Sequence, residues 1–313
     1  MTDDGAVGDS DTGSDTGSDT GGEIDSETPE EGNGTIDSHA VLAKLSWALV
    51  SHPGKVRPHN EDFAGAFAPT TPDDSWDRPP LWVLADGMGG HAAGEVASRL
   101  AVETLLAEWS KGSPSTPMAG LRSGVRAANG AVFDAGDVSG QRGMGTTLCA
   151  LALAGTEAFI ANVGDSRAYL VRDGESTQLT TDHTRVADML RMRMISPEQA
   201  ATHPARSMLT RSLGADLMVQ VDVIKESIRQ GDTFVLCSDG MWDVVARSDI
   251  AEVATAIGTG PVPTPAVAAQ QLVDLAIERG TADNVTAVVV RITSERPIPP
   301  AGARRSLFRR GRT

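Results

Sequence analysis

Short apolar segments with an aspartate at or near one end are the feature that most limits the folds this chain can adopt. Three such pairs occur: 81–85 with Asp86, 233–237 with Asp239 and 285–292 with Asp283. Apolar runs of this length are typical of buried strands. A carboxylate at a strand end lies among the loops, where binding and catalytic groups are usually found. Asp-Gly is also a favoured turn dipeptide, so one such pair alone would predict only a turn.

The other apolar patterns predict an α+β fold. Helical spacing of apolar residues predicts helices over 92–109, 120–135, 185–193, 197–202, 248–256 and 266–279. Further strand-like runs occupy 146–153, 158–163, 168–171 and 219–223. Because strands and helices come in blocks, antiparallel sheets are favoured over a parallel doubly wound fold.

The acidic balance of the chain is unevenly distributed. Of its 313 residues, 27 are Lys or Arg and 42 are Asp or Glu, which gives a formal net charge of −15. Residues 1–36 contain 11 acidic residues and no basic one, whereas residues 301–313 contain five Arg and no acid. A segment so poor in apolar residues cannot bury enough surface to offset its ordering entropy. We therefore predict a disordered acidic tail at 1–40, a folded domain at 41–294 and a Pro- and Arg-rich basic tail at 295–313.

Composition also excludes several classes of protein. The acidic domain lacks the clustered Lys and Arg that nucleic-acid binding requires, so no nucleic-acid partner is expected. The two cysteines, Cys149 and Cys237, are too few for a disulfide framework or a cysteine-based zinc site, and they fit a reducing compartment. The longest apolar stretch, 148–163, is interrupted by polar residues and is shorter than the roughly 20 residues of a membrane-spanning helix. With no secretory signal visible, we expect a cytoplasmic protein without a membrane span.

Several acidic residues have the pattern of a cation site. Gly follows both Asp86 and Asp239, and glycine lets a backbone carbonyl approach a ligand closely. Carboxylates that converge with a carbonyl form an oxygen-only site, which selects Mg²⁺, Mn²⁺ or Ca²⁺ over zinc or copper. Asp165 lies in a turn between two strand-like runs, where it could also be an ordinary hairpin residue. Asp243 would reach the same cleft if a turn of helix begins after Asp239.

An arginine precedes a second group of acids. Arg57 lies shortly before Glu61 and Asp62. The guanidinium group suits bidentate binding of phosphate. The alternative is a surface ion pair of little energetic value.

Eight short motifs follow one another along the chain. They are RPHNED (57–62), ADGMGGH (85–91), GMGTT (143–147), NVGDSRAY (162–169), LTTDHT (179–184), LTRSLG (209–214), CSDG (237–240) and DN (283–284). In this order they resemble the motifs of the metal-dependent protein phosphatases of the protein phosphatase 2C type, in their bacterial form. Each motif alone is weak, but their shared order and spacing make the resemblance specific over about residues 45–293.

The resemblance implies a four-layer α/β/β/α sandwich, in which two mainly antiparallel sheets are flanked by helices. It also implies a two-metal centre at one end of the sandwich and a variable flap at about 185–214. Position by position, Asp86 resembles the carboxylate that bridges both metals, and Gly87 resembles the residue that gives a carbonyl to the second metal. Asp239 and Asp283 resemble the remaining ligands of the first metal.

Further residues match roles around that centre. Glu61 and Asp62 resemble the acidic pair that holds metal-bound water. Asp165, together with Asp239 and Asp243, resembles the weaker third metal site of bacterial members. Arg57 resembles the phosphate clamp. Since no predicted metal ligand is missing, the resemblance implies an active enzyme.

The implied activity is that of a Mn²⁺- or Mg²⁺-dependent protein serine/threonine phosphatase. Two cations that share a water lower its pKa and direct it at phosphorus, which removes the need for a cysteine nucleophile. His91 is the candidate general acid for the leaving alkoxide, and a loop histidine without a catalytic role is the alternative. The expected partners are phosphorylated proteins and Ser/Thr protein kinases, and we expect a monomer. Two other functions stay open: a non-enzymatic phosphoprotein-binding regulatory domain and a phosphatase of small phosphate esters.

Overall fold

The structure is a computed structural model that describes residues 36–41, 45–68, 78–89, 93–111, 116–138, 143–258 and 264–294. Its strands are β1 (Ile36–Val41), β2 (Leu45–His52), β3 (Asp62–Phe67), β4 (Leu81–Met88), β5 (Gly145–Thr146), β6 (Leu148–Ala154), β7 (Glu157–Val163), β8 (Arg167–Arg172), β9 (Glu175–Gln178), β10 (Asp222–Ser227), β11 (Thr233–Cys237) and β12 (Val285–Ile292). Its helices are α1 (Ala93–Lys111), α2 (Pro117–Val138), α3 (Arg185–Arg191), α4 (Pro197–Ala201), α5 (Asp239–Trp242), α6 (Arg247–Thr255) and α7 (Pro265–Glu278).

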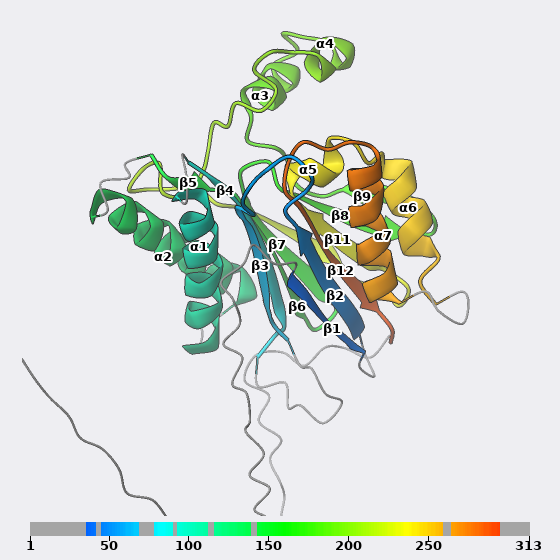
Figure 1. Cartoon of the computed structure of the whole chain (residues 1–313). Helices are drawn as coiled ribbons and strands as arrows, with labels where there is room; N and C mark the ends of the chain where they lie inside the picture. Colours follow the sequence, from blue (N-terminus) through cyan, green and yellow to red (C-terminus); the bar gives the residue numbers. More distant parts are fainter. Residues whose placement is uncertain are drawn as a thin grey trace, which may run out of the picture. The chain divides into compact units, whose positions relative to one another are not determined.

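Two sheets form the centre of this part of the chain (Figure 1). The first has the strand order β1-β2-β12-β11-β8-β9, and the second has the order β10-β7-β6-β4-β3, with β5 paired to β4. Every strand pairing within the described ranges is antiparallel. The preference for antiparallel sheets over a doubly wound fold is therefore confirmed.

Strand β6 shows how the sequence builds a sandwich. Its seven residues are all apolar or Cys and all buried. Side chains of a strand alternate between its two faces. Leu148 and Ala150 point into the core beneath α1 and α2, whereas Cys149 and Leu151 point into the core between the two sheets. Because both faces are buried, the strand reads as a continuous apolar run rather than an alternating one.

Helices cover the outer face of each sheet. Helices α1 and α2 share a buried apolar core with β4 and β6. Helices α6 and α7 share another with β2, β8, β11 and β12 (Figure 1). A third core lies between the sheets. The layers therefore follow the order α/β/β/α, and the predicted α+β sandwich is confirmed.

A small helical segment separates β9 from β10, and we call residues 185–214 the flap. Helix α3 begins after Thr184, whose side chain accepts a hydrogen bond from the amide of Ala187. Helix α4 begins after Ser196, which forms a capping box with Gln199. Figure 1 shows both helices standing away from the sandwich. Local capping therefore shapes these short helices, which have few apolar neighbours to stabilise them.

Several strands differ from the sequence predictions. The strand predicted at 219–223 is wrong in position, because β10 covers Asp222–Ser227 and pairs with β7. Strand β10 lies at the edge of its sheet, and its side chains are partly exposed and mostly polar. The apolar residues that favoured a strand begin before it, at Val219, so the prediction started too early. No strand was predicted for β1, β2, β3, β5 or β9. In β2, serine residues interrupt the apolar pattern although seven of its eight residues are buried.

The structure describes most of the predicted folded domain and only a short part of the predicted tails. Strand β1 pairs with β2, so residues 36–40 of the predicted acidic tail form a strand. Residues 1–35 and the predicted basic tail at 295–313 lie outside the described residues. Within the described ranges, no helix has the length and apolar character needed to cross a membrane.

The core between the sheets should dominate stability. Leu236 lies on β11 in that core and is 0% exposed. We expect Leu236→Ala to lower the free energy of unfolding by about 2–5 kcal/mol, since it leaves a cavity between two rigid layers. Urea denaturation would measure the change. Leu217→Ala is the control, because Leu217 is 66% exposed and should change stability by less than about 0.5 kcal/mol. Equal losses in the two variants would contradict this view of the core.

Candidate active site

Strand ends from both sheets bring acidic residues together at one edge of the sandwich. Strand β3 begins at Asp62, which lies opposite Asp86 near the end of β4. Helix α5 begins at Asp239, just after β11 ends. Asp283 lies just before the start of β12. Since neighbouring antiparallel strands run in opposite directions, the end of one meets the start of the next.

Four carboxyl groups form what we call the carboxylate cluster: Asp62, Asp86, Asp165 and Asp239. Asp62 is 3% exposed and Asp165 is 4% exposed. Asp86 and Asp239 each keep some surface in contact with solvent, and their carboxyl groups lie close enough to influence the pKa values of each other.

Burial and mutual repulsion control the ionisation of this cluster. Burial of the Asp86 carboxyl raises its pKa well above the usual value, and the charges of Asp239 and Asp62 raise it further. Burial likewise raises the pKa values of Asp62 and Asp239. For Asp165, burial raises the pKa to about 7. The cluster therefore resists holding its full negative charge unless a cation is present.

Asp62 is anchored to the opposite sheet. The hydroxyl groups of Ser238 and Thr286 donate to its Oδ2 atom over 2.6 and 2.7 Å. Ser238 occupies the N-cap position of α5, but its side chain makes no capping bond there. It binds the buried carboxylate instead, which holds β3 of one sheet to β11 and β12 of the other.

Two glycines let the chain segments of the site approach one another. A Cβ atom on Gly87 would lie 2.1 Å from the carbonyl oxygen of Gly94 in the first turn of α1. A Cβ atom on Gly240 would lie 2.1 Å from the carbonyl oxygen of Asn284. Any other residue would force these segments apart, so close packing requires glycine at both positions. The predicted role of Gly87 as a carbonyl ligand stays a prediction.

Asn284 fixes the loop between β2 and β3. Its amide nitrogen donates to the carbonyl oxygens of Pro53 and His59 over 2.9 and 2.8 Å. Its amide oxygen accepts from the backbone N–H of Glu61 over 2.8 Å. Burial raises the pKa of Glu61, while the charge of Arg57 lowers it. Asn284 thus holds the loop that carries both of these predicted site residues.

Arg57 lies at the rim of the site, paired with a predicted metal ligand. Its Nη2 atom donates to Asp283 Oδ2 over 2.6 Å, and the two side chains are 49% and 37% exposed. This hydrogen bond raises the pKa of Arg57. An ion pair this exposed contributes little to stability, so Arg57 can exchange its carboxylate partner for another anion at little cost.

Asp165 is held in place by Trp242 of α5. The indole nitrogen of Trp242 donates to its carbonyl oxygen over 3.0 Å. The guanidinium of Arg167 lies 3.5 Å from the centre of the Trp242 ring, and it also binds both carboxylate oxygens of Asp182. Asp243, predicted as a third-site ligand, forms a 2.7 Å ion pair with Arg206 of the flap.

The composition of the cluster fits hard divalent cations. All its side-chain donors are carboxylate oxygens, which Mg²⁺ and Mn²⁺ prefer. A cation would also remove the repulsion that raises the pKa values of these groups. Among the described residues, no three His, Cys, Asp or Glu side chains lie in an arrangement that could hold a metal ion without rearrangement.

The structure brings most predicted site residues to this edge of the sandwich, and one predicted residue is not among those it describes. His91 lies outside the described residues, so its role as general acid stays a prediction. Sequence reasoning did not identify Ser238, Thr286 or Asn284 as residues that position the site. Ser238 and Asn284 each adjoin a predicted ligand in a recognised motif, and this adjacency was the available signal.

Removal of the Asn284 amide should increase local opening of the loop between β2 and β3 and also lower the stability of the protein. We expect Asn284→Ala to lower the free energy of unfolding by about 2–4 kcal/mol, because it removes three hydrogen bonds in a buried setting. Urea denaturation would measure the loss, and hydrogen exchange should show faster exchange at the Glu61 amide. Gln270→Ala, on the exposed face of α7, is the control. Unchanged protection of the Glu61 amide in the variant would contradict this role.

Comparison with known proteins places this site in a family. The family model for protein phosphatase 2C matches residues 66–275. Serine/threonine protein phosphatase PstP of Mycobacterium tuberculosis is 40% identical over 256 residues, which are 80% of this chain and 46% of that protein. The chain thus spans about half the length of this relative. A putative protein phosphatase 2C-type protein of Streptococcus pyogenes is 35% identical over 79% of this chain and 98% of its own length.

A solved structure supports the same relationship. The catalytic domain of PstP in complex with two manganese ions matches with a TM-score of 0.68 and 36% identity. The match covers 80% of this chain and 99% of that one. The sequence motifs, the α/β/β/α sandwich and these relatives all agree, and the chain belongs to the protein phosphatase 2C family.

Proposed function

We propose that this chain is a metal-dependent protein phosphatase that hydrolyses phosphoserine and phosphothreonine. The observation that carries the proposal is the carboxylate cluster, in which burial and mutual repulsion raise the pKa values of four acids at one edge of a protein phosphatase 2C fold. Such a cluster gains stability from cations. Arg57 lies beside it, ready to bind an anion.

Two cations, Mn²⁺ or Mg²⁺, would be held by Asp86, Asp239, Asp283 and the Gly87 carbonyl. When bound, they would supply a water of lowered pKa and neutralise charge on the phosphoryl oxygens. Asp165 would contribute to a third ion. The catalytic domain of PstP was solved in complex with two manganese ions, which agrees with the proposed number.

Arg57 would bind and orient the phosphoryl group. Its present partner, Asp283, is itself a proposed metal ligand, so a cation on Asp283 would weaken the 2.6 Å ion pair. The freed guanidinium could then form two parallel hydrogen bonds to phosphate oxygens. Glu61 and Asp62 would orient water, and the hydroxyl groups of Ser238 and Thr286 would fix Asp62 in place. We assign proton donation to the leaving alkoxide to His91.

The biological setting follows from this chemistry. The substrates would be phosphorylated proteins, and the enzyme would reverse the action of Ser/Thr protein kinases. We propose that it acts as a monomer in the cytoplasm, where the two buried thiols, Cys149 and Cys237, would stay reduced.

Loss of a cluster carboxylate should abolish activity without unfolding the chain. We expect Asp86→Asn to reduce Mn²⁺-dependent hydrolysis of p-nitrophenyl phosphate and of a phosphothreonine peptide by about 100-fold or more, because a proposed metal ligand would be lost. The metal-free variant should be at least as stable as the parent, since an amide at this position avoids both a buried charge and the cost of protonating a carboxylate. Thermal unfolding in chelator would test this second expectation.

Asp274→Asn is the control for this experiment. Asp274 lies on the exposed face of α7, so its variant should keep the activity of the parent. Retained activity in Asp86→Asn would contradict the proposed site. Hydrolysis of aryl phosphate without any peptide hydrolysis would instead favour a phosphatase of small esters, and metal-independent peptide binding without turnover would favour a binding domain.

Stabilisation by Mg²⁺ should increase with pH. Burial raises the pKa of Asp165 from its usual 3.8 to about 7, so the stability of the metal-free protein should fall as pH rises between these values and level off above them. Below pH 7 a cation must displace protons from the cluster, whereas above pH 7 it need not. For each displaced proton, the apparent affinity for the cation falls about tenfold per unit that the pH drops below 7. We expect a larger rise in Tm with Mg²⁺ at pH 7.5 than at pH 5.5. An equal rise at both values would contradict this linkage.

A further inference from the structure

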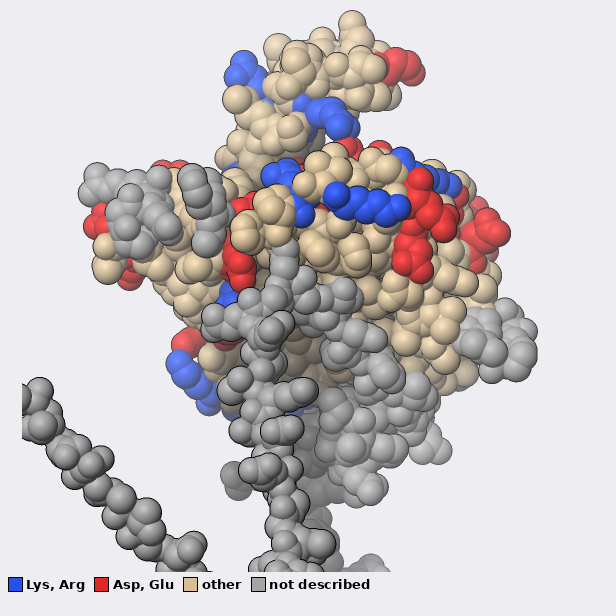
Figure 2. All heavy atoms as spheres, in the orientation of Figure 1, with Lys and Arg blue, Asp and Glu red and all other residues tan. Residues whose placement is uncertain are grey.

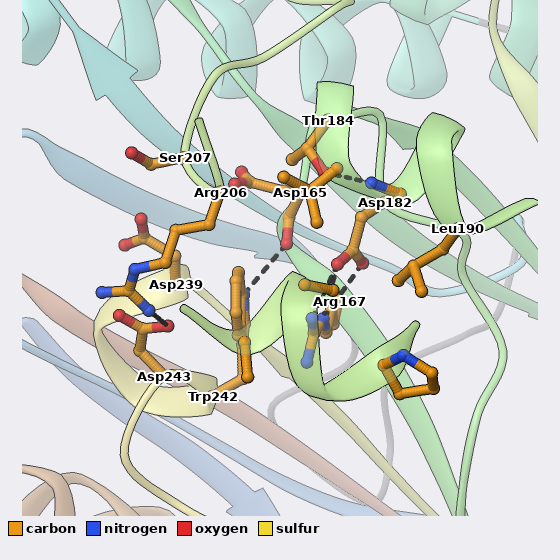
Figure 3. A pocket seen from close by; sticks show the side chains of 15 residues that line it. Asp165, Arg167, Asp182, Thr184, Leu190, Arg206, Ser207, Asp239, Trp242 and Asp243 are labelled. Carbon is orange, nitrogen blue, oxygen red and sulfur yellow. Dashed lines mark hydrogen bonds and ion pairs between the residues drawn. The ribbon is translucent and has the colours of Figure 1, made fainter. Parts of the chain in front are cut away.

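A pocket of about 360 Å³ lies between the flap and the sandwich, beside the carboxylate cluster (Figure 3). Asp165 and Asp239 of the cluster line it, together with residues of α3, α4 and α5. Figure 3 shows Leu190 across the pocket from Asp239. The pocket is therefore continuous with the proposed catalytic centre at one end and bounded by the flap at the other.

Charges outside the cluster are matched within the pocket wall. Asp182 is bound by Arg167, with a shortest separation of 2.6 Å. Asp243 is bound by Arg206 over 2.7 Å. Arg167 also covers the face of Trp242. Each acid lining the pocket is thus either part of the carboxylate cluster or paired with an arginine. Away from the cluster, the acids of the wall are therefore already matched and offer little attraction to a charged side chain.

The two helices of the flap form an apolar part of the pocket wall. This part consists of Val186, Ala187, Leu190, Pro197, Ala200 and Ala201, whereas Arg206 and Ser207 add polar groups from the end of the flap. Leu190 and Pro197 keep exposed surface, which solvent covers when the pocket holds no ligand. Burying such surface against an apolar group is favourable in proportion to the area removed from water.

We propose that this pocket binds an apolar side chain of the phosphoprotein substrate, close to the phosphorylated residue. The inference rests on the proposed phosphatase function and adds a substrate preference to it. The phosphoryl group would bind at the cluster and Arg57, while a neighbouring side chain would pack against Leu190 and Pro197 of the flap. Flap residues would thus select substrates through contacts separate from the metal ligands.

The charge of the flap favours a phosphorylated chain as the occupant. Residues 185–214 contain five Arg and only two acidic residues, in a chain whose net charge is −15. Figure 2 shows basic side chains both on the flap and on the face of the sandwich beneath it. A phosphopeptide that carries an apolar residue matches both the basic surroundings and the apolar wall.

Peptide turnover would test the pocket directly. A set of phosphothreonine peptides would carry Leu, Gly, Glu or Arg at each of the neighbouring positions, and p-nitrophenyl phosphate would serve as a substrate that carries no neighbouring residue. We expect kcat/KM to be about tenfold higher for Leu than for Gly at one position, a value typical of an apolar subsite. Leu190→Asp should remove this preference. The ratio of two substrates within one variant does not depend on how much enzyme is folded.

Met192→Asp is the matched control. Met192 follows α3 directly, is 65% exposed and does not line the pocket, so its variant should keep the preference for Leu. Three results would overturn the inference: a Leu to Gly ratio within twofold in the parent, faster turnover of the Glu or Arg peptides, or the same ratio in the Leu190 and Met192 variants. Absence of hydrolysis of every substrate, aryl phosphate included, would instead overturn the proposed function and this inference with it.

Discussion

Burial of several carboxyl groups at one edge of the sandwich is the constraint on which the site depends. Water would separate and solvate these charges, whereas the protein holds Asp62, Asp86 and Asp239 close enough for each charge to raise the pKa of its neighbours. The unfavourable free energy of that arrangement appears as raised pKa values across the cluster. Cations relieve it, so affinity for metal and local instability of the metal-free site have the same physical origin.

The two-sheet framework makes this arrangement possible. Three apolar cores stabilise the layers, and the core between the sheets continues along β11 and β12 to the edge where the acids lie. Hydrogen bonds from Ser238 and Thr286 to Asp62 then join the sheets at the site itself. Antiparallel pairing contributes too, because it places strand starts and strand ends at one edge. Stability gained in the cores can thus offset repulsion in the site.

The flap is built by different forces from the sandwich. Its short helices begin at capped residues, and exposed methionines lie outside the helices at 192, 194 and 208, so local hydrogen bonds shape the flap more than burial does. An ion pair between Arg206 and Asp243 and the lining of the pocket connect it to the site. Such a segment can change in sequence without disturbing the metal ligands. This separation would let substrate preference vary while the chemistry stays the same.

Fold class, family and most of the helices and inner strands could be predicted from the sequence, because buried strands such as β6 and β12 are continuous apolar runs. The motifs also predicted which acids form the site, and the structure places Asp62, Asp86, Asp165 and Asp239 together. Edge strands such as β10 were missed or misplaced, since half-exposed strands lack an apolar signal. Only the tertiary structure decided the hydrogen bonds of Asn284, the Arg57–Asp283 pair and the pocket beneath the flap. These contacts join residues far apart in the chain, and no local pattern encodes them.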